Sequence, residues 1–412
     1  MCGIVGAIAD RDIVPILMEG LRRLEYRGYD STGVAVVGGT GKLTLQRAVG
    51  KVASLQKLLD AAPHGGSLGL AHSRWATHGG VTEANAHPHV SCGRIAVIHN
   101  GIIENYAAIK SELTAGGYDF TSETDSEVIG HLVHSFVVQG LDLREAVQAA
   151  VARFHGAYAI VVIDAEQPDR VVAARIASPL VVGLGEGENF VASDVQALLP
   201  VTRRFQFLEE GDVADVRREG VRVFDASGAE VERPVHESSL SADAVERGEY
   251  AHYMLKEIYE QPRAIADTLS ERMVDGKVLE AILGPRAAEI LPKIQQLHIV
   301  ACGTSWHAGM VARYAFEEIA RVPCSVEIAS EYRYRKPVVP AGTLFLAISQ
   351  SGETADTLAA MREAGKLGYL ATAVICNVPE SSLVREAELV LMTRAGPEIG
   401  VASTKAFTTQ LA

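Results

Sequence analysis

A cysteine at the second position of the opening stretch MCGIVG is the first residue with evident chemistry. If Met1 is removed, Cys2 carries a thiol and a free α-amine on one residue. A terminal α-amine has a pKa of roughly 7.7–8.0, so it can take the thiol proton near neutral pH and later return it to a leaving group. Cys2 is therefore a candidate nucleophile for acyl transfer. The alternative is a small buried thiol in a first strand.

A cysteine that attacks an amide needs fixed hydrogen-bond donors for the oxyanion that forms. The segment HNG places Asn100 and Gly101 directly after an apolar run. The side-chain amide of Asn100 can donate, and the missing Cβ of Gly101 lets its backbone N–H approach a substrate closely. The alternative is an ordinary Asn-Gly turn after a strand.

An amino-acid substrate also needs a cation for its carboxylate and an anion for its ammonium group. Arg74 in SRWATHG can bind a carboxylate through two parallel hydrogen bonds, which lysine does less well. Thr77 can add a hydroxyl and His78 a backbone donor, while Asp125 in ETDSE has the opposite charge. A structural or surface ion pair is the alternative for Arg74 and Asp125.

Four histidines and a tryptophan lie among these segments. His87 and His89 in AHPH invite a metal-binding interpretation, but a proline holds an extended path between them and no third ligand follows nearby, which favours structural roles. His72 and His99 stand at the ends of predicted strands, as core histidines often do. The side chain of Trp75 is expected to be half-buried and to anchor the packing around it. No metal or organic cofactor is expected.

Together these segments resemble the class II, or N-terminal-nucleophile, glutamine amidotransferases. After CGIVG, further segments match in order: EYRGYDSTG (25–33), HSRWATHG (72–79), NAHPH (85–89), HNGIIENY (99–106) and SETDSEVI (122–129). The resemblance covers residues 2–225 and implies a glutaminase domain. It implies Cys2 as nucleophile, Asn100 and Gly101 as oxyanion hole, a glutamine-binding set, and an ammonia gate at Trp75; the glutamine-binding set is Arg74, Thr77, His78, Asp125 and Arg27.

The elements that must position these residues form two patterns. Short β-type runs such as GIVGAIA, TGVAVVG, RIAVIHN and AYAIVVID bunch together, and helical patterns such as VPILMEGLRRLEY bunch between them. This arrangement predicts an α+β domain with helices on the faces of sheets, and the resemblance implies the αββα sandwich of the N-terminal-nucleophile hydrolases. Residues 226–285 are expected to be a linker and helical connection, with a helix that bends or restarts at Pro262.

From residue 286 the pattern changes to continuous apolar strands, such as LHIVACG, TLFLAIS and YLATAVICN, that alternate with helices. Such alternation predicts an α/β domain with a parallel sheet over residues 286–412. Two of its strand-to-helix turns are rich in hydroxyl groups and glycine; they contain Gly303, Thr304 and Ser305, and Ser349, Gln350, Ser351, Gly352 and Thr354.

These turns fit a phosphate site at the carboxyl ends of parallel strands, because helix N-termini and hydroxyl groups donate to anions. The alternative is simple N-capping, which needs fewer such residues than SQSGET supplies. No Walker A or dinucleotide motif is present, which argues against a nucleotide. SQSGETADT and ACGTS resemble the sugar isomerase (SIS) fold, and EIGVASTKAFTTQL (398–411) matches its continuation, which implies Val401, Ser403 and Lys405 near the sugar.

Composition limits the function classes. The chain has 412 residues, a net charge of −13 and 5 widely spaced cysteines. The acidic balance argues against nonspecific nucleic-acid binding, and the cysteines suggest a reducing compartment rather than a disulfide framework. We see neither a signal peptide nor an apolar run long enough to span a membrane, so the cytoplasm is the expected location.

The two resemblances together imply an amidotransferase that releases ammonia from L-glutamine and passes it to fructose 6-phosphate, giving glucosamine 6-phosphate and glutamate. They also imply a homodimer through the SIS half. Because the chain stops at an apparent helix start, we expect a fragment without a second SIS domain, with glutaminase activity and partial sugar-phosphate binding at most. Two alternatives stay open: another class II amidotransferase, and a non-enzymatic phosphosugar sensor.

Overall fold

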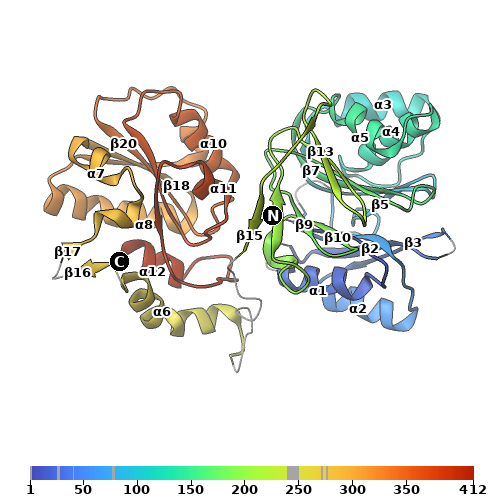
Figure 1. Cartoon of the computed structure of the whole chain (residues 1–412), viewed down its shortest axis with the longest axis horizontal. Coiled ribbons are helices and arrows are strands. Elements are labelled where there is room, and N and C mark those ends of the chain that lie inside the picture. The colour runs from blue at the N-terminus through green and yellow to red at the C-terminus, as the bar shows by residue number, and fades with distance from the viewer. Residues whose placement is uncertain are drawn as a thin grey trace. The chain divides into compact units, whose positions relative to one another are not determined.

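The computed structural model describes residues 2–25, 28–39, 41–76, 79–238, 250–270, 272–274 and 277–412 (Figure 1). The chain divides into two compact units, Met1–Ala242 and Asp243–Ala412. Three residues with predicted roles, Arg27, Thr77 and His78, lie outside the described residues.

Two antiparallel sheets form the first unit. One has eight strands in the order β15-β11-β9-β10-β1-β4-β2-β3. Its strands are β1 (Gly3–Ile8), β2 (Ser31–Val37), β3 (Leu43–Val49), β4 (Leu68–Arg74), β9 (Val181–Leu184), β10 (Asn189–Ala192), β11 (Arg204–Phe207) and β15 (Val235–Glu237).

The other sheet has seven strands in the order β14-β13-β12-β8-β7-β6-β5. They are β5 (His89–Ser91), β6 (Ile95–Ile103), β7 (Gly156–Asp164), β8 (Val171–Ile176), β12 (Val213–Val216), β13 (Val221–Phe224) and β14 (Glu230–Val231).

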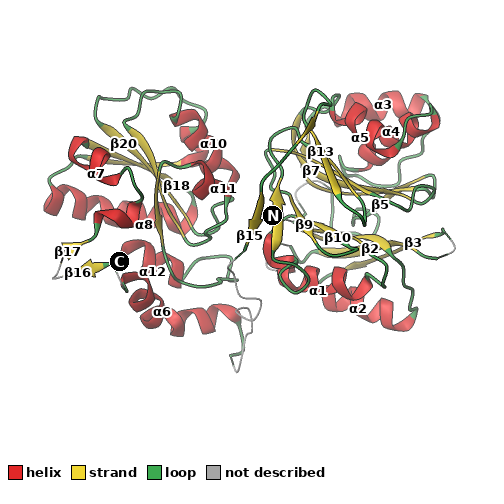
Figure 2. Cartoon of the chain, in the orientation of Figure 1, coloured by secondary structure: helices red, strands yellow, loops and turns green. Residues whose placement is uncertain are grey.

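Helices cover the outer face of each sheet, as Figure 2 shows. Helices α1 (Val14–Leu24) and α2 (Val52–Ala61) cover the eight-stranded sheet, and α3 (Tyr106–Ala115), α4 (Glu127–Val138) and α5 (Leu143–Val151) cover the other. A short 3-10 helix, η2 (Val195–Ala197), packs against α1. The layers therefore form an αββα sandwich, which confirms the fold class predicted for this part of the chain.

Strand β1 shows why the sequence folds in this way. All six of its residues are buried because both faces of its sheet are covered. Side chains alternate between faces along a strand. Val5 and Ala7 accordingly pack toward the helices, whereas Ile4 and Ile8 pack in the core between the two sheets.

A five-stranded parallel sheet forms the centre of the second unit, in the order β19-β18-β20-β21-β22. Its strands are β18 (Gln296–Ala301), β19 (Cys324–Ile328), β20 (Thr343–Ser349), β21 (Ala371–Cys376) and β22 (Leu389–Met392). Apolar clusters lie on both faces of this sheet. The predicted α/β SIS architecture with a parallel sheet is thus confirmed.

The helices of this unit are α6 (Tyr253–Leu269), α7 (Ala287–Ile290), α8 (Gly303–Ala315), α9 (Ala329–Tyr332), α10 (Ala355–Ala364), α11 (Ser382–Glu386) and α12 (Lys405–Leu411). Short segments complete it: β16 (Met273–Val274), β17 (Lys277–Val278), η4 (Glu280–Leu283), η5 (Leu291–Lys293) and η6 (Phe316–Ala320). Helix α6 runs through Pro262 as one helix, so the restart considered there does not occur. None of the described helices is long and apolar enough to cross a membrane.

Candidate active site

Cys2 lies at the start of β1, beside the end of β4. The antiparallel register pairs Gly3 with Ser73, which brings the thiol next to Trp75. The backbone N–H of Trp75 donates to Sγ of Cys2 at 3.1 Å. Burial raises the pKa of the Cys2 thiol, while the Trp75 N–H and the Arg74 charge oppose that rise. The thiol thus has one fixed donor and one nearby cation that favour its thiolate form.

Asn100 reaches Cys2 from the other sheet. It lies in β6, and its Nδ2 donates to the backbone carbonyl of Cys2 at 3.0 Å. The amide oxygen of Asn100 contacts Nε2 of His72 at 3.0 Å. The structure therefore brings together Cys2 and Asn100, which are 98 positions apart in the sequence.

Gly101 follows in the same strand and has a φ of +132°. A Cβ at this position would lie 2.0 Å from the carbonyl oxygen of Ala157 in β7. Only glycine therefore fits here. The close approach to β7 and the positive φ both require glycine, and the donor role of its backbone N–H stays a prediction.

Arg74 and Asp125 are both buried in this unit, with 5% and 3% of their surface exposed. Arg74 donates to the carbonyl oxygens of Gly80 at 3.0 Å and Gly79 at 3.3 Å. Asp125 accepts from the backbone N–H of Ile103 at 2.8 Å. Burial lowers the pKa of Arg74, and the charges of Cys2, Asp30 and Asp125 counteract this effect. Arg74 thus lies within electrostatic reach of both the thiol and Asp125.

Trp75 is half-buried and packs edge-on against the ring of Tyr29, with centroids 5.2 Å apart. This contact agrees with the predicted anchor. Trp75 therefore makes two separate contacts: its backbone N–H donates to the Cys2 thiol, and its ring packs against Tyr29.

The four predicted structural histidines form one buried cluster. The rings of His72 and His87 stack at 4.3 Å, and those of His87 and His89 meet edge-on at 4.7 Å. Burial lowers the pKa of every member, to about 3 for His72 and for His89. Within the described ranges, no group of three or more His, Cys, Asp or Glu side chains is arranged to hold a metal ion.

Sequence reasoning missed three polar side chains that hold the segment after β4. Asp30 accepts from the backbone N–H of Ala76 at 2.8 Å. Asn85 donates to the carbonyl of Gly80 at 3.0 Å and to Glu123 at 3.0 Å, and Glu123 accepts from the backbone N–H of Gly80 at 3.3 Å. Asp30 and Asn85 lie in segments already singled out, YDSTG and NAHPH. Their type alone gave no signal, because each acts on a backbone group that only the fold brings near.

The second predicted site lies at the carboxyl ends of β18 and β20. These strands are parallel neighbours that pair Ala301 with Ile348, so the two hydroxyl-rich turns lie at the same edge of the sheet. Oγ of Ser349 accepts from the backbone N–H of Gly352 at 3.0 Å, and Oγ of Ser351 accepts from Glu353 at 3.2 Å.

The two turns differ in how much of their polar surface is free. Gln350, Ser351, Thr354 and Thr304 are half-buried, whereas Ser305 is buried and accepts from Nε2 of Gln410 at 3.1 Å. Gly303 and Gly352 both have a positive φ, of +56° and +67°. Each turn therefore needs its glycine to place the following helix start.

The remaining predicted residues precede or begin α12. Val401 is 74% exposed, and Ser403 is half-buried. Lys405 is 4% exposed, and its Nζ lies 2.7 Å from Oε2 of Glu260 in α6. Burial and the ion pair with Glu260 give Lys405 a structural explanation.

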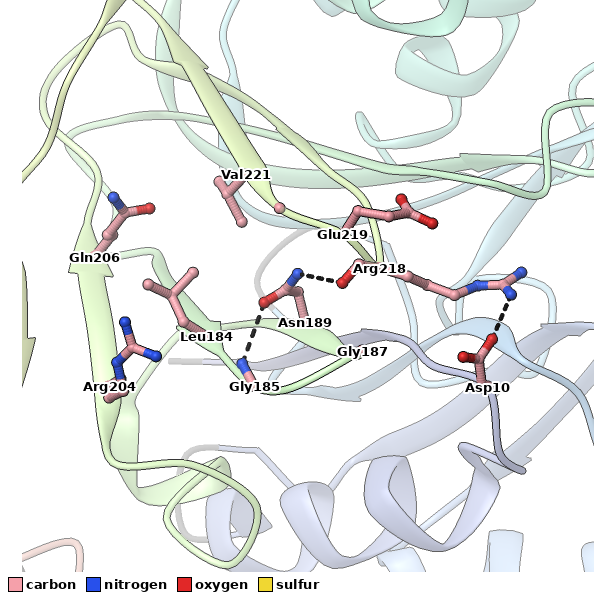
Figure 3. Close-up of a pocket in the computed structure, with 11 residues that line it drawn as sticks. Asp10, Leu184, Gly185, Gly187, Asn189, Arg204, Gln206, Arg218, Glu219 and Val221 are labelled. Carbon is pink, nitrogen blue, oxygen red and sulfur yellow. Dashed lines mark hydrogen bonds and ion pairs between the residues drawn. The ribbon is translucent and has the colours of Figure 1, made fainter.

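A separate pocket of 390 Å³ lies in the first unit (Figure 3). It is lined by the ends of the β9–β10 and β12–β13 hairpins and includes none of the predicted site residues. Asn189 spans it by accepting from Gly185 at 3.2 Å and donating to the carbonyl of Arg218 at 3.2 Å, and Arg218 pairs with Asp10. Its lining contains no cysteine, serine, threonine or histidine, so this pocket lacks the groups for the thiol chemistry predicted for Cys2.

One family model matches within each compact unit. The model described as a glutamine amidotransferase domain matches residues 72–200, and the SIS domain model matches residues 290–412. The fold and these matches define a class of protein: a glutamine amidotransferase joined to a sugar isomerase domain.

Curated relatives narrow that class. The glutamine–fructose-6-phosphate aminotransferase (isomerizing) of Shigella flexneri is 60% identical over 411 residues, which cover 100% of this chain and 67% of the relative. The protein of the same name in Escherichia coli is 59% identical with the same coverage. The chain belongs to the glutamine–fructose-6-phosphate aminotransferase family.

Solved structures also match. The C-terminal domain of glucosamine-fructose-6-phosphate aminotransferase from Francisella tularensis is 57% identical and covers 40% of this chain and 47% of that chain, with a TM-score of 0.40. A glutamine phosphoribosylpyrophosphate amidotransferase from B. subtilis is 17% identical and covers 91% of this chain and 81% of that chain, with a TM-score of 0.47.

Proposed function

We propose that this chain hydrolyses L-glutamine at Cys2 and binds the sugar phosphate within an enzyme that delivers the ammonia to fructose 6-phosphate, forming glucosamine 6-phosphate and glutamate. One observation carries the glutaminase half: Asn100, from the opposite sheet, lies 3.0 Å from the Cys2 carbonyl, beside a thiol held by Trp75. The names of the curated relatives support the sugar substrate.

In the proposed reaction the Cys2 thiolate attacks the side-chain amide carbon of glutamine. The thiol proton passes to the α-amine that removal of Met1 exposes, and from there to the departing nitrogen. Asn100 and Gly101 donate to the oxyanion, and ammonia leaves as the thioester forms. Water then attacks the thioester, glutamate is released, and the thiol is restored.

Substrate binding is assigned to the charged residues around the thiol. Arg74 is assigned to the α-carboxylate and Asp125 to the α-ammonium. Thr77 and His78 are proposed as further hydrogen-bond donors, and Arg27 completes the proposed glutamine-binding set. Support for the first two assignments comes from their opposite charges and from the position of Arg74, whose charge interacts with both the Cys2 thiol and Asp125.

The sugar phosphate is assigned to the second unit. The turns after β18 and β20 offer hydroxyl and amide groups to the phosphate, through Thr304, Ser305, Ser349, Gln350, Ser351 and Thr354. Val401 and Ser403 are proposed to contact the sugar, and Trp75 to gate ammonia. We propose residues 2–225 as the glutaminase, 226–285 as the connection and 286–412 as the SIS domain, in a cytoplasmic enzyme that dimerises through the SIS half.

Intact mass and two cysteine variants test the glutaminase assignment. We expect a mass without Met1, loss of glutamate release in Cys2→Ala, and retention of release in Cys92→Ala, which removes an exposed thiol of the same unit. Glutamate release by Cys2→Ala, or a retained Met1 in an active protein, would contradict the proposal. A wild-type chain that binds fructose 6-phosphate without any glutaminase activity would favour a phosphosugar-binding module instead.

A further inference from the structure

We propose that His72 is a positioning residue that sets the orientation of the Asn100 amide in the oxyanion hole. This inference rests on the proposed glutaminase function. It concerns a histidine in β4 whose ring is 1% exposed and which reaches Asn100 from the other sheet.

The geometry leaves one orientation for the amide. Nδ2 of Asn100 donates to the Cys2 carbonyl at 3.0 Å, so Oδ1 faces Nε2 of His72, also at 3.0 Å. An amide oxygen can only accept, so Nε2 must carry a proton. Turning the amide over would place its oxygen against the Cys2 carbonyl and its NH2 group against an N–H, and both hydrogen bonds would be lost.

The surroundings hold the His72 ring in the required form. Nδ1 of His72 is buried and has no hydrogen-bond partner among the described residues. Burial lowers the pKa of the ring, and the Asn100 amide and, more weakly, the His99 backbone act against this lowering. A proton there would leave a buried N–H unpaired, which costs free energy. The ring is therefore the neutral tautomer with its proton on Nε2, and its lowered pKa agrees with this form.

His87 braces the ring from the other side. The two imidazoles stack at 4.3 Å with an angle of 23° between their planes. His87 is itself fixed, because its Nδ1 accepts from the backbone N–H of His99 at 3.1 Å. This stack fixes the plane of the His72 ring, and the hydrogen bond to Asn100 fixes which edge of the ring faces the amide.

The consequence concerns the transition state. The amide group of Asn100 has two N–H bonds, one of which is used on the Cys2 carbonyl. The other remains for the oxyanion while the Cys2 carbonyl and the His72 N–H together keep the amide oxygen turned away. Without His72, the amide can present its oxygen to the developing negative charge, which would repel it.

Two substitutions separate the donor from the ring. His72→Gln retains an N–H donor, whereas His72→Phe retains the ring and its stack but cannot donate. We expect kcat for glutamine hydrolysis to fall about 10- to 100-fold in His72→Phe with KM changed by less than about threefold, since one oriented donor is affected. His72→Gln should recover most of the lost kcat.

A double-mutant cycle and a spectroscopic measurement complete the test. In an Asn100→Ala background, His72→Phe should cause no further loss, because His72 acts through Asn100. Imidazole ¹⁵N NMR of the chain at pH 7, assigned by comparison with His72→Gln, should show Nε2 protonated and Nδ1 unprotonated.

The inference is overturned by wild-type kcat in His72→Phe, by an additive loss in the Asn100→Ala background, by an effect on KM alone, or by a proton on Nδ1. The NMR result does not depend on activity, so it decides the inference even if His72→Phe fails to fold. Glutaminase activity that survives Cys2→Ala would instead reject the proposed function. The NMR measurement would then still show which nitrogen of His72 carries the proton.

Discussion

The backbone N–H of Trp75 donates to the thiol of Cys2 at 3.1 Å, across 73 positions of sequence. The contact exists because β1 and β4 pair antiparallel, so the start of one strand meets the end of the other. Arg74 ends β4 and therefore stands beside the nucleophile. The same pairing thus positions the thiol and the cation assigned to glutamine.

Arg74→Lys should raise KM for glutamine about 30- to 100-fold and change kcat much less, because a bidentate contact to the α-carboxylate is lost. Steady-state glutaminase kinetics measure both constants. Arg47→Lys is a matched control: Arg47 also lies in this sheet and donates to backbone carbonyls, of Ala84 and Ala86, at 3.2 Å. An equal KM increase in both variants would contradict the assignment of Arg74.

Gly101→Ala should destabilise the first unit by about 3 kcal/mol or more, because its Cβ would lie 2.0 Å from the Ala157 oxygen at a φ of +132°. Glutaminase activity should be lost even at temperatures where the variant is folded. Gly93→Ala is the control, since Gly93 has a φ of +66° but no atom within 4 Å of the added Cβ. Its cost should stay near 1 kcal/mol. Chemical denaturation measures both, and equal costs would refute the role of the close approach.

The buried histidines should make the first unit less stable in acid. His89 has a pKa of about 3 in the fold against 6.5 ordinarily, so the unfolded chain binds a proton that the folded chain does not. The free energy of unfolding should therefore fall as pH decreases from about 6.5 toward 3, by about 1.4 kcal/mol per pH unit for each such histidine.

His89→Gln should reduce the slope of the free energy of unfolding against pH by the contribution of one histidine. Trp75 and Trp306 are the 2 tryptophans, so in a Trp306→Phe background the fluorescence of Trp75 reports the first unit. Slopes are compared between about pH 6.5 and pH 5, above the range in which Glu127, a neighbouring carboxylate with a lowered pKa, titrates. An unchanged slope would show that His89 does not contribute.

Ser349→Ala should weaken fructose 6-phosphate binding about tenfold. Its hydroxyl accepts from the Gly352 N–H at 3.0 Å and so shapes the turn that offers donors to the phosphate. Isothermal titration calorimetry with fructose 6-phosphate, and with inorganic phosphate for comparison, measures the change. Ser325→Ala, in edge strand β19, should leave the affinity unaltered, and an equal loss there would count against a specific site after β20.

Much of the fold could be predicted from sequence because its signals are local. Continuous apolar strands after residue 286 indicated a parallel sheet, and the runs GIVGAIA and RIAVIHN indicated β1 and β6. Helix α6 shows the limit of such local signals. Pro262 suggested a possible restart, yet α6 is one continuous helix that packs against α12. Tertiary contacts can outweigh the local preference of a single proline.

The candidate site also combines features that the sequence predicts with features that only the tertiary structure shows. The types of Cys2, Asn100, Gly101, Arg74 and Asp125 indicated glutaminase chemistry, because a thiol, donors and two opposite charges are what that reaction requires. By itself the sequence determined this set of groups and the secondary structure that bears them. Only the tertiary structure decided that Asn100 meets Cys2 across two sheets and that His72 carries its proton on Nε2. A tautomer depends on which groups surround the ring, and those groups come from strands that are distant along the chain.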